Sequence, residues 1–193
     1  MAIIDLNNPF SMKIAIIGTH STGKTSIITH LQAALETHGK HVVVLEELAR
    51  VCPMPINEQT TLDAQKWILL NQISRETEID HSDKVFITDR SALDNFAYMY
   101  RITSPLDISH FERAAAEHMA SYDYVFKTKK LSIEAKADGI RSTDKEFRDM
   151  MDRLIAHLFL KNQVPYHLLP ASKAYDVHVD TILKTIGVGE ASR

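Results

Sequence analysis

The sequence predicts an α/β protein in three layers: a doubly wound parallel sheet with helices on both faces. Two observations lead to this prediction. Five short runs rich in Val, Ile, Tyr and Phe are mostly continuous in apolar character, which is typical of strands covered on both faces. Segments with the apolar spacing of amphipathic helices fill the intervals, and strands that alternate with helices build layered α/β sheets.

The apolar runs are the predicted strands. Runs such as Ile-Ala-Ile-Ile and Val-Val-Val-Leu could also occur in a buried helix, but segments this short suit strands better than helices. The predicted strands span residues 13–17, 41–46, 84–88, 122–127 and 165–169.

The intervals between the strands hold the predicted helices. In the first helix, Ile27 and Leu31 fall on one face, and Gly39 follows as a natural C-terminal stop. The fifth helix opens with a capping box from Thr143 to Glu146. The predicted helices span residues 25–38, 59–80, 92–102, 109–121, 143–162 and 175–186.

Composition indicates a soluble protein without a general affinity for nucleic acid. The 193 residues carry 22 Lys and Arg against 25 Asp and Glu, and the net charge of −3 gives no general attraction to DNA, RNA or an acidic membrane. Cys52 is the single cysteine, so no internal disulfide can form. The N-terminal residues lack signal-peptide features, and no apolar run approaches the ~20 residues needed to cross a bilayer. We therefore expect a cytoplasmic protein with no membrane partner.

We expect one domain over residues 12–193, preceded by a loosely held tail over residues 1–11. Met12 begins the stretch Met-Lys-Ile-Ala-Ile-Ile-Gly and looks like a natural start. Residues 128–141 are polar, charged and without periodicity. This stretch is the predicted mobile loop, and we expect a lid over about residues 128–148.

Residues 18–25, Gly-Thr-His-Ser-Thr-Gly-Lys-Thr, match the phosphate-binding pattern G-x-x-x-x-G-K-[ST] at every fixed position. A predicted strand precedes them and a predicted helix follows, which is the required context. The glycines let backbone N–H groups approach phosphates closely, and the helix N-terminus adds a positive dipole end. Lys24 should reach the β- and γ-phosphates of ATP, and the Thr25 hydroxyl should bind Mg²⁺. The predicted nucleotide-binding residues are Gly18, His20, Ser21, Thr22, Gly23, Lys24, Thr25 and Ser26.

Asp89 follows the third predicted strand, at the sheet edge that faces ligands in open α/β sheets. This position suits a residue that holds Mg²⁺ directly or through water. Arg90 and Ser91 come next, where many motor ATPases need a Glu to activate water. The D-x-x-G and N-K-x-D patterns of switch GTPases do not occur in the sequence. Hydrolysis is therefore disfavoured, and phosphoryl transfer to a bound acceptor is favoured.

Acidic and basic residues follow the second predicted strand at the same sheet edge. A carboxylate from Glu46 or Glu47 could take the proton of an acceptor hydroxyl, and we favour Glu47. Arg50 could orient the acceptor. Arg90 should point over the cleft, where a guanidinium suits a fork-like hold on phosphate or carboxylate. The structural alternatives are a helix N-terminal charge for the acid and an exposed ion pair for Arg90.

Further side chains complete the predicted site. Arg141 in the lid would stabilise the transferring phosphate when the lid closes, and Arg148 would bind substrate from the next helix. Gln72 could read the edge of a base, with Trp67 or Tyr98 stacking on it. Alternatively, Trp67 belongs to the core, Gln72 is a surface amide and the lid is an ordinary solvated loop.

Four stretches resemble a group of P-loop kinases that includes the ribosylnicotinamide kinase domain and the deoxynucleoside kinases. They are residues 18–25, Glu-Glu-Leu-Ala-Arg at 46–50, the segment from Asp-Arg-Ser to Phe-Ala-Tyr at 89–98, and Asp-Gly-Ile-Arg at 138–141. The resemblance implies a P-loop NTPase fold with five parallel strands in the order 2-3-1-4-5. One departure concerns the acceptor: ribosylnicotinamide kinases have a D-T-D-like pattern where Asp-Arg-Ser stands here, which puts nicotinamide riboside itself in doubt.

The resemblance also implies roles for individual residues. Glu47 takes the place of the acceptor-side carboxylate, with Arg50 as its companion. Asp89 and Arg90 take the places of the catalytic-edge pair, and Arg141 takes that of a lid arginine.

We therefore expect an ATP-dependent kinase that transfers the γ-phosphoryl group of Mg-ATP to a nucleoside, a nucleotide or a modified base. Two alternatives stay open. One is a kinase that acts on a hydroxymethylated pyrimidine in DNA, as a related group does, although the net charge disfavours a nucleic-acid partner. The other is a regulatory ATPase whose bound nucleotide switches a partner surface. A homodimer is compatible with the sequence.

Overall fold

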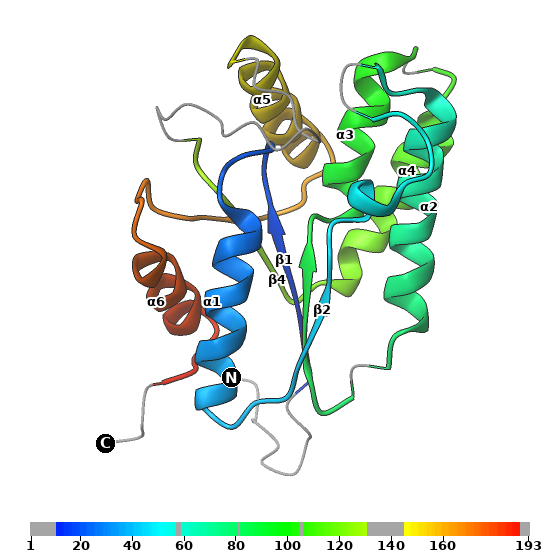
Figure 1. Ribbon diagram of the computed structural model, residues 1–193. Coiled ribbons are helices and arrows are strands. Elements are labelled where there is room, and N and C mark those ends of the chain that lie inside the picture. The colour runs from blue at the N-terminus through cyan, green and yellow to red at the C-terminus, as the bar shows by residue number, and fades with distance from the viewer. Residues whose placement is uncertain (1–10, 57–58, 81, 105, 131–144, 190–193) are drawn as a thin grey trace.

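A computed structural model describes residues 11–56, 59–80, 82–104, 106–130 and 145–189. Five strands form one parallel sheet in the order β2-β3-β1-β4-β5, and helices lie on both sides of it (Figure 1). The predicted fold class and strand order are therefore confirmed. The predicted tail, apart from Ser11, and most of the predicted lid lie outside the described residues, so the division into tail, domain and lid stays a prediction.

All five predicted strands are present, with ends that shift by at most two residues. The central strand β1 is buried along its whole length, whereas β5 keeps two residues, both exposed. An edge strand pairs on one side only, which explains its shortness. The strands are β1 (Met12–Ile17), β2 (Val42–Leu45), β3 (Val85–Asp89), β4 (Tyr124–Lys127) and β5 (His167–Leu168).

The helices follow the predicted order. α2 starts later than predicted because the Thr61 side chain caps it, accepting a hydrogen bond from the Ala64 N–H at 3.2 Å. The predicted cap Thr143 lies outside the described residues. Within the described ranges, no helix is both long and apolar enough to span a membrane. The helices are α1 (Lys24–Thr37), α2 (Leu62–Glu78), α3 (Ala92–Ile102), α4 (Ser109–His118), α5 (Lys145–Lys161) and α6 (Tyr175–Thr185), with 3₁₀ turns η1 (Leu48–Val51) and η3 (Met119–Ser121).

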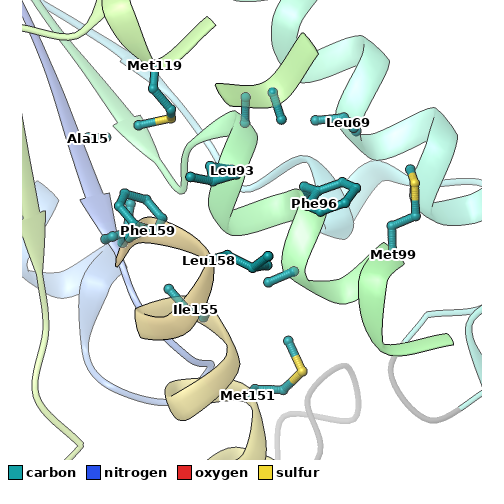
Figure 2. Packing of buried hydrophobic residues seen from close by; sticks show 14 of the residues in the cluster. Ala15, Leu69, Leu93, Phe96, Met99, Met119, Met151, Ile155, Leu158 and Phe159 are labelled. Atoms are coloured by element: carbon teal, nitrogen blue, oxygen red, sulfur yellow. The ribbon is translucent and has the colours of Figure 1, made fainter. Parts of the chain in front are cut away.

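Two apolar layers hold the sheet between the helices. Side chains of β1 alternate between them: Ala15 faces the layer built with α2, α3, α4 and α5, whereas Ile14 faces the layer built with α1 and α6. Figure 2 shows the first layer, where Phe96 of α3 and Leu158 of α5 are fully buried. Both layers together fix the carboxyl edge of the sheet relative to the surrounding helices.

Three strands bring their carboxyl ends together. Ile16 of β1 pairs with Asp89 of β3, and Ile17 pairs with Lys127 of β4. The loop that leaves β1 at Gly18 therefore runs between the ends of β3 and β4 before α1 begins. This edge carries the residues that the sequence singles out.

Candidate active site

The loop between β1 and α1 has a backbone that suits glycine at its two fixed positions. Gly18 and Gly23 have φ angles of +132° and +84°, and Ser21 between them has φ of +56°. A Cβ on Gly18 would lie 2.4 Å from the Thr128 Oγ1 atom, so no other residue fits there without displacement. Gly23 precedes α1 and offers no capping side chain, which leaves the first N–H groups of the helix to an anion.

Lys24 lies at the start of α1 and is buried against this loop. Its Nζ atom donates a hydrogen bond to the Thr19 carbonyl oxygen at 2.9 Å. Burial, and after it the charge of Arg90, lower the pKa of Lys24 to about 8. The neighbouring carboxylates thus compensate the ammonium group only in part, and a bound phosphate would complete the compensation.

Thr25 and Asp89 form the second part of the site. The Thr25 hydroxyl donates to Asp89 Oδ2 at 2.7 Å. The other carboxylate oxygen, Asp89 Oδ1, is buried and has no hydrogen-bond partner among the described residues. A hydroxyl and a carboxylate oxygen without a partner fit the oxygen-ligand chemistry of Mg²⁺. Within the described ranges, no three His, Cys, Asp or Glu side chains gather to hold a metal. Phosphate oxygens would therefore supply some of the Mg²⁺ ligands beside Thr25 and Asp89.

Arg90 differs from its prediction, because its guanidinium is buried and does not point freely over the cleft. Its side chain is 6% exposed, and its backbone has φ of +86°. Nε donates to Glu47 Oε1 at 2.8 Å, and Nη1 donates to the Gly18 carbonyl at 3.2 Å and to Asp94 Oδ2 at 3.3 Å. The guanidinium also lies over the Tyr98 ring, 4.8 Å from its centroid. Arg90 therefore joins the loop between β1 and α1 to the carboxylates of Glu47 and Asp94.

Glu47 and Glu46 face different surroundings. Glu47 is 6% exposed and points to Arg90, whereas Glu46 is exposed to solvent. Arg50 follows one 3₁₀ turn later and is 34% exposed, with its Nε 3.5 Å from Glu47 Oε2. Of the two acids, Glu47 is thus the one that the fold brings to the site.

Gln72 does not have the surroundings of a base-reading residue. It is fully buried, its Nε2 donates to Glu76, and its Oε1 accepts from Asn95 Nδ2 at 3.3 Å. Glu76 in turn lies 2.8 Å from the Nζ of the buried Lys13. The alternative of a surface amide is therefore wrong, because the buried glutamine links α2 and α3. Substrate binding by Gln72 stays a prediction, which these contacts do not support.

Arg148 contacts the loop between β1 and α1, where the phosphates are predicted to bind. Its Nη2 donates to the Ser21 carbonyl oxygen at 3.3 Å. The neighbouring Phe147 contacts the His20 ring, with ring centroids 5.4 Å apart. The first turn of α5 therefore touches the phosphate loop through two consecutive side chains. Arg141, the predicted lid arginine, lies outside the described residues.

The remaining predicted loop residues have local partners. Thr22 Oγ1 lies 3.0 Å from the Thr19 carbonyl oxygen, to which it donates, and the Ser26 carbonyl lies 2.8 Å from His30 Nδ1. Thr22 Oγ1 also lies 2.7 Å from Thr128 Oγ1, at the end of β4.

Sequence reasoning missed Asp94 and Thr128. Asp94 is fully buried and accepts a hydrogen bond from the Gly18 N–H at 3.4 Å in addition to its contact with Arg90. Burial raises the pKa of Asp94, while Arg90 and Lys24 act in the opposite direction. In the sequence, Asp94 lies three residues after the cap Ser91, a position where acids commonly stabilise a helix N-terminus, so its position gave no sign of a further role. Thr128 carries no sequence signal, because only the pairing of β1 with β4 places it against Gly18.

Solved structures that the chain resembles include two kinases and NadR protein, at 15–17% sequence identity. Deoxyadenosine kinase from M. mycoides, with products dCMP and dCDP bound, has a TM-score of 0.64 at 15% identity, over 91% of this chain and 98% of that one. Thymidylate kinase from Ehrlichia chaffeensis has a TM-score of 0.64 at 16% identity, over 93% and 100%. NadR protein in complex with NAD and AMP-PNP has a TM-score of 0.72 at 17% identity, over 95% of this chain and 51% of that one. This chain thus spans about half the length of NadR.

Among curated proteins, no sequence matches the chain significantly. A family model described as an AAA domain matches residues 13–176, which is most of the chain. The chain therefore belongs to this AAA domain family, and its five-stranded sheet has the fold of the P-loop nucleoside and nucleotide kinases.

Proposed function

We propose that this protein is an ATP-dependent phosphotransferase that moves the γ-phosphoryl group of ATP to a nucleoside, a nucleotide or a modified base. The phosphate loop and Lys24 would hold the triphosphate, and Glu47 would lie on the acceptor side. Arg90 would position Glu47 and the loop relative to each other. Such a reaction depends on positioning and charge neutralisation more than on covalent chemistry by the protein.

One observation carries the proposal: a single buried guanidinium bonds the phosphate loop and a candidate base. Arg90 reaches the Gly18 carbonyl at 3.2 Å and Glu47 at 2.8 Å. Lys24 and Asp89 lie on the same loop and sheet edge. A protein that only hydrolyses ATP needs a group that activates water, and the position after Asp89 holds Arg90 instead of a carboxylate.

Mg²⁺ would be held by the Thr25 hydroxyl and the Asp89 carboxylate, whose Oδ1 has no protein partner among the described residues. When bound, it would neutralise charge on the phosphate oxygens. Deoxyadenosine kinase was solved with nucleotides bound, and NadR protein was solved with AMP-PNP, an ATP analogue, which supports ATP as the donor.

The test is ADP formation from Mg-ATP in the presence of a panel of nucleosides and nucleotides. Lys24→Ala should lose on the order of 100-fold or more in rate, as when one transition-state donor is removed. Lys184→Ala, which changes an exposed lysine of α6, is the matched control and should keep the full rate. ADP formation that never depends on an acceptor would contradict the proposal and favour the regulatory ATPase. A homodimer, a cytoplasmic location and a DNA acceptor stay predictions from the sequence.

A further inference from the structure

The loop between β1 and α1 has a strained backbone that its surroundings must hold in place. Ser21 has φ of +56°, a left-handed conformation that residues other than glycine rarely adopt, and Gly18 and Gly23 on either side also have positive φ. Such a conformation persists only where neighbouring contacts determine it. The contacts that hold this loop therefore decide how well its N–H groups and Lys24 are placed for a nucleotide.

Two threonine hydroxyls connect the loop to the end of β4. Thr128 directly follows β4, and its Oγ1 atom lies 2.7 Å from Thr22 Oγ1 in the loop. Thr22 Oγ1 lies 3.0 Å from the Thr19 carbonyl oxygen, and Thr128 Oγ1 lies 3.1 Å from the Ile17 carbonyl oxygen. Each hydroxyl has a single proton, so one hydroxyl donates to the other and the second donates to its carbonyl. In either direction, the pair ties Thr22 to β4.

Burial and close packing keep the Thr128 hydroxyl in place. Thr128 is 1% exposed, so water cannot readily replace its protein partners. A Cβ on residue 18 would lie 2.4 Å from Thr128 Oγ1, so the hydroxyl occupies space that only Gly18 leaves open. Gly18 and Thr128 therefore fit each other, and the hydroxyl points at the loop.

The chain of hydrogen bonds ends at Lys24. The buried Thr19 carbonyl oxygen, which accepts from Thr22, also accepts from Lys24 Nζ at 2.9 Å. An ammonium group carries further N–H donors, so Lys24 can keep this bond and still donate to phosphate oxygens. A long flexible side chain loses rotamer entropy when it is held for a ligand. A carbonyl that already fixes Lys24 would reduce this cost at the moment of binding.

We propose, on the basis of the ATP binding proposed above, that Thr128 and Thr22 are positioning residues for Lys24. The Thr128 hydroxyl donates to Thr22 Oγ1, and the Thr22 hydroxyl donates to the Thr19 carbonyl oxygen. This carbonyl then orients the Lys24 ammonium toward the phosphates before the nucleotide binds. The two hydroxyls act through the loop and do not touch the reacting atoms.

Calorimetry of Mg-ATP binding tests the proposal without the need for an acceptor. Thr128→Ala removes the hydroxyl, whereas Thr128→Ser keeps it and removes only the methyl group. We expect Thr128→Ala to raise the Kd for Mg-ATP about fivefold or more, and Thr128→Ser to stay within about twofold of the wild type. Thr77→Ala is the matched control and should keep the wild-type Kd. Thr77 is exposed on α2, and its hydroxyl also donates to a backbone carbonyl, that of Ile73, at 2.7 Å.

The variants leave no carbonyl of the chain without a donor, so we expect them to fold. The Ile17 carbonyl still accepts from the Thr128 N–H at 3.0 Å, and the Thr19 carbonyl still accepts from Lys24. Thr22→Ala and Thr22→Ser repeat the comparison at a half-buried position. The double variant Thr22→Ala/Thr128→Ala should bind Mg-ATP no more weakly than the weaker single variant, because both hydroxyls belong to one chain.

The possible results separate this inference from the proposed function. Thr128→Ala with the wild-type Kd would overturn the inference even if its Tm fell, because the hydroxyl would then serve packing alone. Thr128→Ser as weak as Thr128→Ala would also overturn it, and so would a double variant whose loss is the product of the two single losses. A wild-type protein that takes up no Mg-ATP would contradict the proposed function itself.

Discussion

Gly18→Ala is the substitution with the most specific structural consequence. Gly18 has φ of +132°, which L-residues other than glycine rarely adopt. The added Cβ would lie 2.4 Å from Thr128 Oγ1 and 3.4 Å from the Thr128 carbonyl oxygen. The Thr128 hydroxyl cannot retreat freely, since it lies 2.7 Å from Thr22 Oγ1 and 3.1 Å from the Ile17 carbonyl oxygen.

The magnitude follows from these two effects. Backbone strain of this kind costs about 1–3 kcal/mol, and the contact with Thr128 places the sum at the upper end, near ~3 kcal/mol. For a protein of this size each kcal/mol lowers the Tm by about 2–4 °C, so Gly18→Ala should lower it by about 6–12 °C. Gly39→Ala is the matched control: Gly39 has φ of +72° with nothing within 4 Å of an added Cβ. Strain alone, about 1 kcal/mol, should lower the Tm of this control by about 2–4 °C.

Thermal unfolding with and without Mg-ATP separates stability from function. A ligand at 100 times its Kd stabilises the folded state by about 2.7 kcal/mol, which is about 5–11 °C here. Gly39→Ala should keep this ligand-induced rise in Tm, whereas Gly18→Ala should lose most of it because the phosphate loop is displaced. A Gly18→Ala variant with the Tm of the Gly39→Ala control and the full rise with Mg-ATP would refute the reasoning.

Three further predictions concern charge and capping. Burial lowers the pKa of Lys24 to about 8, so its ammonium form is lost as pH rises through 8, and calorimetry should show weaker ATP binding at pH 9 than at pH 7. A Lys24→Arg variant that still binds ATP should show a flatter dependence of affinity on pH. A flat profile for the wild type would contradict the role of Lys24 in ATP binding. Glu76→Gln removes the carboxylate partner of the buried Lys13 and should lower the free energy of unfolding in urea by about 3–5 kcal/mol. The exposed Glu78→Gln should lower it by less than about 0.5 kcal/mol. Burial opposes the charge of Glu76, but His118 and Lys13 lower its pKa below 4.5, so this stabilisation should be complete above about pH 4.5 and be lost in more acidic buffer. Ser91→Ala removes the cap of α3 and should cost about 1 kcal/mol by the same assay, and a neutral effect would mean that the cap bond to the Asp94 N–H contributes little.

The sequence by itself determined the elements of the fold and the phosphate loop. Strand and helix patterns are local, and the continuous apolar runs at β1 and β3 indicate strands that are buried on both faces. The loop is local as well, because its glycines, Lys24 and Thr25 lie within eight residues and need only a strand before and a helix after them. The edge position of Asp89 follows equally from its place at the end of a strand.

Only the tertiary structure decided which polar groups meet. Arg90 contacts Glu47, 43 positions away, and Asp94 contacts Gly18, 76 positions away; no local spacing encodes either contact. Packing also decided which predicted side chains are accessible to a ligand. Gln72, which the sequence suggested as a base-reading residue, is enclosed between α2 and α3, and Arg148 contacts the loop between β1 and α1. A buried polar group must find a partner to offset its lost hydration, and which partner it finds depends on how the layers pack.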